Sequence, residues 1–218
     1  MKNERRTFWL LLALLMALLT ATLFLTLKLD RKPAMQRPAP DVTYPEHWDL
    51  EKILHEVLQL MRNNQLPAAQ SMLTAALKKY PDNSDVWMLR GSVYYRQELF
   101  DRAAHAFAIV EQQQPDNAAA SNNRAESLIR LQRFEEARSA IARAVKLQPN
   151  NGEILLNAAG IHALLRDDKT ALFFLKKAMA NGITPEMISM HRELVSLSER
   201  PEFMEYYKSK QSKKQPRK

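Results

Sequence analysis

The side chains of this chain that could do chemistry are five histidines and scattered acidic residues, and their spacing does not build a catalytic site. The histidines are His47, His55, His105, His162 and His191. None of them forms an H-E-x-x-H motif or another tight ligand pair for a metal ion. Neighbouring Glu135 and Glu136 fall on different sides of a helix, and we interpret them as solvated charges. We expect no enzymatic activity, no metal site and no cofactor.

The composition points to helices and away from loops that hold phosphates. Only four glycines occur in 218 residues, and no Gly-rich phosphate loop or G-x-S-x-G motif is present. The sequence contains no cysteine, which excludes disulfides and thiolate metal sites within it. Ala, Leu, Gln, Glu, Lys and Arg are common, and all of them favour helices. The fold class that this predicts is all-α.

The elements that would position any site are visible in the middle of the chain. Trp87, Gly91 and Tyr94 share one face of a predicted helix, because residues three and four apart are neighbours on a helix. Ala103 and Phe107 share a face of a second predicted helix, and a polar turn separates the two. The pattern predicts a helical hairpin in which Trp87, Gly91 and Tyr94 pack inside.

This hairpin pattern recurs with a period of 34 residues. The prolines that end the second helices keep this spacing at Pro81, Pro115 and Pro149. The small residues do so at Ala69, Ala103, Ala137 and Ala171. The larger apolar residues do so at Leu73, Phe107, Ile141 and Leu175. A fixed period of this length is typical of stacked repeats, each of which buries its apolar face against its neighbours.

The order Trp, Gly, Tyr, Ala, Phe, Pro at this period resembles the tetratricopeptide repeat (TPR) family, over about residues 50–182. The resemblance implies a right-handed α-α superhelix, a TPR solenoid, built from four hairpins. They are expected at 50–83, 84–117, 118–151 and 152–183. The other repeats depart from the second at the Trp, Gly and Tyr positions, with Ile53, Val57 and Leu60, then Ser121, Ala125 and Leu128, then Leu155, Ala159 and His162. Most of these residues are apolar or small, so the departures bear on packing quality.

The resemblance further implies that the first helices line a concave groove that binds a protein or peptide. The candidate partner-binding residues are Met88, Ser92, Tyr95, Asn122, Glu126 and Arg130. Met and Tyr would give adaptable apolar contact, and the polar residues would orient the partner. The groove positions of the first and fourth hairpins are mostly apolar, so the groove has apolar ends and a polar middle. The alternative is that these are ordinary surface residues and that the apolar ends of the groove pack against the linker or the C-terminal cap.

Some TPR domains capture a C-terminal carboxylate with a clamp of lysine and asparagine side chains. In this sequence, Leu54, Leu58 and Met88 stand where such residues would be expected. The resemblance therefore does not extend to binding of chaperone tails.

A run of twenty residues without a charge, 8–27, follows a short basic head at 1–7. As a helix with a rise of about 1.5 Å per residue, it would span one hydrocarbon core. We interpret it as an uncleaved transmembrane helix, with a cleaved signal peptide as the alternative. Basic residues flank both sides, so the positive-inside rule gives little preference. We expect an inner-membrane protein with a cytoplasmic N-terminus and exported repeats.

The remaining segments are a linker, a cap and a tail. Residues 28–49 are rich in proline, which disfavours a helix and predicts a semi-rigid spacer. Residues 184–208 are expected to form capping helices, beginning with one helix over 185–198. Residues 209–218 read as a basic, disordered tail. Contact of 208–218 with anionic lipid is the alternative to a solvated end, and we do not expect nucleic-acid binding.

The sequence therefore predicts a membrane-anchored TPR scaffold that binds a protein or peptide partner, in envelope protein assembly, secretion or maturation. The alternative is a structural subunit of a stable membrane complex with no separate peptide site.

Overall fold

The computed structural model describes residues 44–198 and 201–205, and this part of the chain is helical without strands. Four consecutive hairpins make up most of it. They are α2 (Leu50–Arg62) with α3 (Leu66–Lys79), α4 (Ser84–Arg96) with α5 (Phe100–Gln113), α6 (Ala118–Arg130) with α7 (Phe134–Leu147), and α8 (Gly152–Leu164) with α9 (Asp168–Ala180). Two short helices follow, α10 (Pro185–Ser189) and α11 (Arg192–Ser198). The predicted all-α repeat fold is confirmed.

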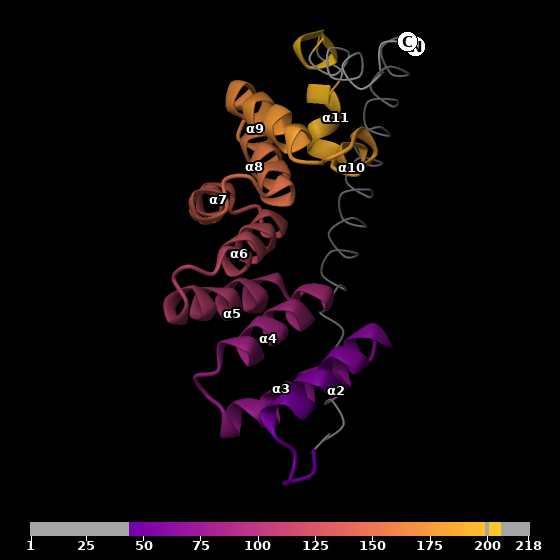
Figure 1. Cartoon of the computed structure of the whole chain (residues 1–218), viewed down its shortest axis with the longest axis vertical. Coiled ribbons are helices and arrows are strands. Elements are labelled where there is room, and N and C mark those ends of the chain that lie inside the picture. Colours follow the sequence, from indigo (N-terminus) through magenta and orange to yellow (C-terminus); the bar gives the residue numbers. More distant parts are fainter. Residues whose placement is uncertain (1–43, 199–200, 206–218) are drawn as a thin grey trace, which may run out of the picture. The chain divides into compact units, whose positions relative to one another are not determined.

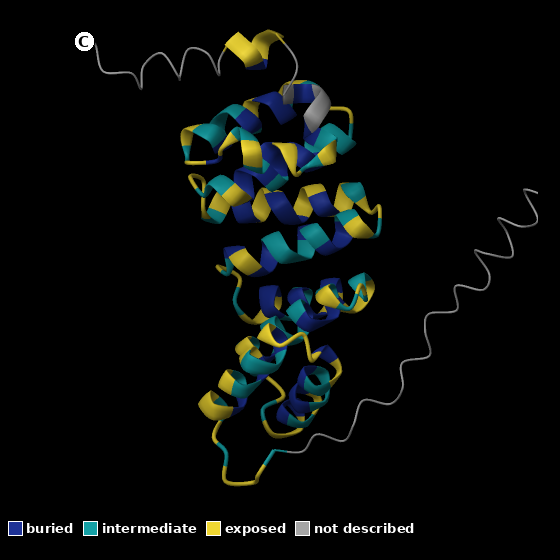
Figure 2. Ribbon diagram, turned by 90° about the vertical axis from the view of Figure 1, so that its right-hand side faces the viewer, coloured by how far each residue is buried: buried dark blue, intermediate teal, exposed yellow. Residues whose placement is uncertain are grey.

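The hairpins stack in the order of the sequence (Figure 1). The second helix of each hairpin packs against the first helix of the next, as α3 does on α4, α5 on α6 and α7 on α8. First helices also contact one another, so that α4 lies between α2 and α6, and α6 lies between α4 and α8. Buried residues follow the inner faces of the helices, while the turns are largely exposed (Figure 2).

In each hairpin, a smaller residue of the first helix is paired with a larger residue of the second helix, at matching positions of the repeat. The pairs, first helix then second helix, are Val57 and Leu73, Gly91 and Phe107, Ala125 and Ile141, and Ala159 and Leu175. A Cβ added to Gly91 would lie 2.5 Å from Cε1 of Phe107, so the phenyl ring occupies the space that alanine fills in the later repeats. The glycine is therefore the complement of the largest second-helix residue.

Trp87 does not lie in the hairpin interior that the sequence pattern predicts for it. Its side chain is only partly buried and packs on the core of the preceding repeat. The indole Nε1 donates a hydrogen bond of 2.8 Å to the carbonyl oxygen of Pro81, at the turn before α4. An indole that must satisfy its N–H favours such an edge position, with one end apolar and the other polar.

Helix ends repeat as regularly as the core. An Asp or Asn side chain caps the first helix of every hairpin by accepting a bond from a backbone N–H within the first turn, at Asp49, Asn83, Asn117 and Asn151. The turn inside every hairpin contains one residue in the left-handed region, with φ of 57–62°, at Asn64, Glu98, Gln132 and Arg166. The N-terminal caps satisfy orphan N–H groups, and the left-handed residues end the first helices, as at Schellman-type C-caps.

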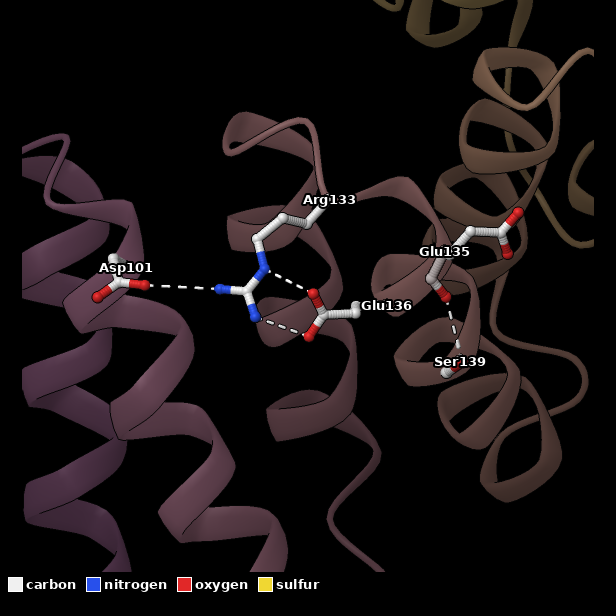
Figure 3. A network of polar contacts seen from close by, with 5 residues as sticks. All are labelled: Asp101, Arg133, Glu135, Glu136 and Ser139. Carbon is white, nitrogen blue, oxygen red and sulfur yellow. Dashed lines mark hydrogen bonds and ion pairs between the residues drawn. The ribbon is translucent and has the colours of Figure 1, made fainter.

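Exposed charges link neighbouring turns. Figure 3 shows the guanidinium of Arg133 paired with both carboxylate oxygens of Glu136, at 2.6 and 2.7 Å, and reaching Asp101 of α5 at 3.5 Å. Hydrogen bonding to Arg133 lowers the pKa of Glu136 below its ordinary value. Glu135 instead pairs with Arg138 at 2.6 Å. These acids are exposed, and they form surface ion pairs along α7.

The C-terminal cap differs from the single helix expected over 185–198. The chain breaks between α10 and α11, because the N–H groups of Met190 and His191 bond carbonyls only three residues back and so tighten the last turn. Ile188, Leu194 and Leu197 of the two helices are buried together with Leu155 and Leu175, in the core of the fourth hairpin. Phe203 joins the same core. The cap thus covers the apolar end of the stack.

Among the residues that the structure describes, no helix is both long and apolar enough to cross a membrane. The predicted transmembrane helix at 8–27, most of the linker and the basic tail lie outside the described residues.

Candidate functional site

A pocket of about 580 Å³ lies between the first helices of the last three hairpins and the cap. From α4 and α6 it is lined by Tyr95, Glu126, Ile129 and Arg130. From α8 it is lined by Glu153, Leu156 and Asn157. From the cap it is lined by Met187, Met190, His191 and Glu193. The apolar lining comes from Ile129, Leu156 and the two methionines, and the rest of the lining is polar or charged.

Two amides from neighbouring repeats hold Glu126 in place. Its Oε1 accepts hydrogen bonds from Nδ2 of Asn122 at 2.9 Å and from Nδ2 of Asn157 at 2.7 Å. The Asn157 amide also donates to Oδ1 of Asn122, at 3.0 Å. Asn122 lies one helical turn before Glu126, and Asn157 comes from the next repeat. The stacking of α6 on α8 therefore fixes the orientation of this carboxylate.

Tyr95 and Arg130 both contact the ring of Phe100. The rings of Tyr95 and Phe100 meet edge to face with centroids 5.4 Å apart, and the guanidinium of Arg130 lies 4.8 Å from the Phe100 ring centre. Burial raises the pKa of Tyr95, and the nearby charge of Glu126 raises it further while Arg130 opposes this. Tyr95 is therefore a neutral hydroxyl at the pocket wall, able to donate or accept a hydrogen bond.

The cap contributes a paired histidine. Nδ1 of His191 lies 3.3 Å from Oε1 of Glu193, and both side chains are partly buried. This hydrogen bond raises the pKa of His191, to which the charges of Glu193 and Glu126 add. The same bond lowers the pKa of Glu193. Glu193 also lies against Gly160, where an added Cβ would be 2.9 Å from its Oε1.

The structure brings together some of the predicted partner-binding residues and leaves others out. Tyr95, Glu126 and Arg130 line the pocket, and Asn122 stands behind Glu126. Met88 and Ser92 do not line it, and their part in binding a partner stays a prediction. The hydroxyl of Ser92 donates to the carbonyl of Met88 one turn back at 3.0 Å, and the Met88 side chain packs against the core of its own hairpin.

Sequence reasoning missed the residues that the cap supplies to the pocket, because it treated the cap as a cover for the end of the stack. A signal was present in Met190 and His191, which lie three and four residues after Met187 and fit no core pattern of the repeats. Glu153 was also missed; it follows the N-cap Asn151 and reads as a first-turn acid. No group of three or more potential metal ligands occurs within residues 44–198 and 201–205.

Similar solved structures share the fold. "MamA MSR-1 C2" is 24% identical, with 64% of this chain and 80% of that chain covered and a TM-score of 0.56. TTC0263, a TPR protein of Thermus thermophilus, is 21% identical over 75% of this chain and 88% of that chain, with a TM-score of 0.58. The first TPR of Spaghetti (RPAP3), bound to an HSP90 peptide, is 23% identical over 56% and 99%, with a TM-score of 0.51. No curated protein matches the chain.

A family profile described as "Tetratricopeptide repeat" matches residues 56–118, 91–152 and 122–182 in overlapping registers. These matches together cover more than half of the sequence and follow the hairpins seen in the structure. This chain therefore belongs to the tetratricopeptide repeat family.

Proposed function

We propose that this protein is a scaffold that holds a segment of a partner protein in the pocket between α4, α6, α8 and the cap. The observation that carries the proposal is the pocket itself, about 580 Å³ with an apolar wall and a carboxylate that two amides orient. Sites that bind a ligand with specificity combine apolar surface with a few polar groups held in fixed positions. The first TPR of Spaghetti was solved with a bound HSP90 peptide, which is a precedent within the fold.

The exposure of Met190 supports the same use of the pocket. Its side chain is 80% exposed at the rim, although methionine is among the residue types most often buried. A flexible thioether side chain adapts to different apolar partners and loses exposed surface when one docks. Met190 would then change from a solvated to a covered side chain on binding.

We propose further that residues 8–27 anchor the scaffold in a membrane, with the N-terminus in the cytoplasm and the repeats exported, and that it acts in envelope protein assembly, secretion or maturation. The uncharged length of 8–27 supports the anchor. A reporter fused to the C-terminus tests the orientation, and activity of a reporter that works only in the cytoplasm would reverse it. An anchor would raise the effective concentration of the pocket for partners at the same membrane.

The test of partner binding is site-specific photo-crosslinking in cells that make the full chain. A photoreactive amino acid replaces Met190 at the pocket rim or, as the matched control, Phe173 on α9, which is 60% exposed and does not line the pocket. We expect a discrete crosslinked partner from position 190 that is absent from position 173. Combining the probe with Tyr95→Ala and Arg130→Ala should remove the product.

That double variant also removes the stacking of both residues on Phe100, so we expect it to cost about 1–2 kcal/mol of stability while the protein stays folded. Circular dichroism verifies the fold before crosslinking is compared. Equal products from positions 190 and 173, or a product from 190 that survives the double variant, would contradict the proposal.

A further inference from the structure

We propose that the segment held in the pocket carries a lysine or arginine side chain next to an apolar one, so that this TPR site selects cationic rather than acidic partners. The inference rests on the proposed function and names the chemistry of its partner.

The charges of the pocket do not cancel. Three carboxylates line it, from Glu126, Glu153 and Glu193, against the guanidinium of Arg130 and the imidazole of His191. His191 is bonded to Glu193, so that pair is satisfied internally. The hydrogen bonds that Glu126 accepts come from neutral amides, and both go to Oε1. Neutral amides orient a carboxylate without balancing its charge, and this leaves the other oxygen of Glu126 to a ligand.

Neighbouring groups respond to the same negative charge. The pKa of His191 is raised first by its bond to Glu193, and the charge of Glu126 adds to this across the pocket. The pKa of Tyr95 is raised first by burial and then by Glu126, and Arg130 only partly offsets it. The guanidinium of Arg130, which also lines the pocket, lies over the ring of Phe100. A ligand cation near Glu126 would therefore meet a favourable potential.

The apolar wall fits the stem of a long basic side chain. Ile129 and Leu156 form this wall on the helices, and Met187 and Met190 form it on the cap. Lysine and arginine place three or four methylene groups along apolar surface while the charged end reaches a polar group. A site with carboxylates beside such a wall matches this division. An acidic side chain would place its charge next to Glu126 and Glu153 instead.

The neighbour with a bound peptide holds a ligand whose charged residues are mostly acidic. Its peptide, SRMEEVD, contains three acidic residues and one basic residue. In the present chain, Leu54, Leu58 and Met88 occupy positions where a clamp for such a peptide would need lysine or asparagine. The acidic peptide of that neighbour therefore gives no reason to expect an acidic ligand in this pocket, although the fold is shared.

The test uses pools of fluorescent nonapeptides on the immobilised full chain. The central residue is fixed as Lys, Arg, Glu or norleucine, and every other position is an equal mixture of Leu, Ala, Ser and Thr. Retention is measured at low and at physiological salt, because exposed charge interactions weaken with ionic strength. The variant is Glu126→Gln with Glu153→Gln, which keeps side-chain size. Glu193 is left intact, since it pairs with His191.

The matched control is Glu135→Gln, which removes the charge of an exposed glutamate on α7 outside the pocket. We expect the Lys and Arg pools to be retained at least tenfold over the Glu pool, with norleucine between them. The Gln pair should reduce this preference at least fivefold, and Glu135→Gln should leave it unchanged.

Preference for the Glu pool, or equal retention of all pools, would overturn the charge assignment while leaving the proposed scaffold function in place. A Lys preference that survives the Gln pair would also overturn it, because the cation would then bind elsewhere. Retention of no pool would overturn it as well, and crosslinking from position 190 would still decide the proposed function separately.

Discussion

Substituting Gly91 by alanine tests whether the repeats are matched by size across each hairpin. The new Cβ would lie 2.5 Å from Cε1 of Phe107 and 2.8 Å from two further ring carbons. Atoms in ordinary contact are about 3.5–4.0 Å apart, so roughly 1 Å of separation must be gained. Phe107 is 1% exposed, and its ring has no solvent into which it can turn. Helices α4 and α5 must therefore move apart.

The magnitude follows from two opposing terms. Overpacking a tight core costs about 1–3 kcal/mol, and the rigid ring places this site at the upper end. Alanine in a helix interior returns about 1 kcal/mol relative to glycine. We expect Gly91→Ala to lower the free energy of unfolding by about 2 kcal/mol. Phe107→Ile alone should cost about 2 kcal/mol through lost burial and the space left beside Gly91.

The double variant is the decisive measurement. Gly91→Ala with Phe107→Ile recreates the pair that the third repeat uses, Ala125 with Ile141, which are both buried in one core. We expect it to cost about 2 kcal/mol instead of the additive 4, a coupling of about 2 kcal/mol. Urea unfolding followed by circular dichroism measures all three variants. A stabilised Gly91→Ala, or a double variant at the additive value, would refute size matching.

Three further changes have expected outcomes. Glu98 has a φ of 61°, and Glu98→Gly should raise the free energy of unfolding by about 0.5–1 kcal/mol. Glycine relieves the strain of the left-handed backbone, and part of this gain is lost to the greater entropy of the unfolded chain. Equal or lower stability in urea unfolding would contradict this. Glu111→Ala should lower the free energy of unfolding by about 1–3 kcal/mol in the same assay, since the buried Glu111 accepts a 2.7 Å bond from Arg124. The loss is limited because Arg124 is partly exposed and water can solvate its guanidinium. An unchanged stability would mean that water replaces the pair. The pair of His191 with Glu193 should stabilise the cap only within a pH window. At the alkaline end, the raised pKa of His191 means that this stabilisation is complete below the ordinary histidine value of 6.5 and is lost as pH rises through the raised pKa. At the acid end, the stabilisation is lost as pH falls through the lowered pKa of Glu193. His191→Gln should flatten this dependence of cap stability, measured by hydrogen exchange of α11 between pH 5 and 9, and an unchanged pH profile would exclude the pair as its source.

The repeat architecture could be predicted because it is written in local signals that recur at a fixed period. Pro115 and Pro149 stand at equivalent turns, each preceded by a residue with φ of −131°, as the restriction before proline requires. The caps Asn117 and Asn151 repeat with the same period as the prolines and mark the starts of α6 and α8. Local signals of this kind depend on neighbours along the chain.

The candidate site was only partly predictable, because four of the eleven residues that line the pocket come from the cap, which folds back onto the repeats. The helical face on which a residue lies was enough to select Tyr95, Glu126 and Arg130, which line the pocket. It could not reveal that Ser92 would bond its own helix, nor that the chain would turn between α10 and α11 and bring His191 to the pocket. That turn is set by burial of the cap on α8 and α9, which no periodicity of the repeats encodes.

Helix α11 contacts α8 at the end of the stack, so opening of this end also affects the pocket. In an array whose units touch mainly their neighbours, the ends open more readily than the middle. Release of α10 and α11 would remove one wall of the pocket while α4, α6 and α8 stayed in place. The amide of Leu194 donates a hydrogen bond of 2.9 Å to the carbonyl of His191. Its hydrogen-exchange rate therefore reports how often the cap opens and the pocket loses this wall. A bound segment would slow that exchange, because it stabilises the closed cap.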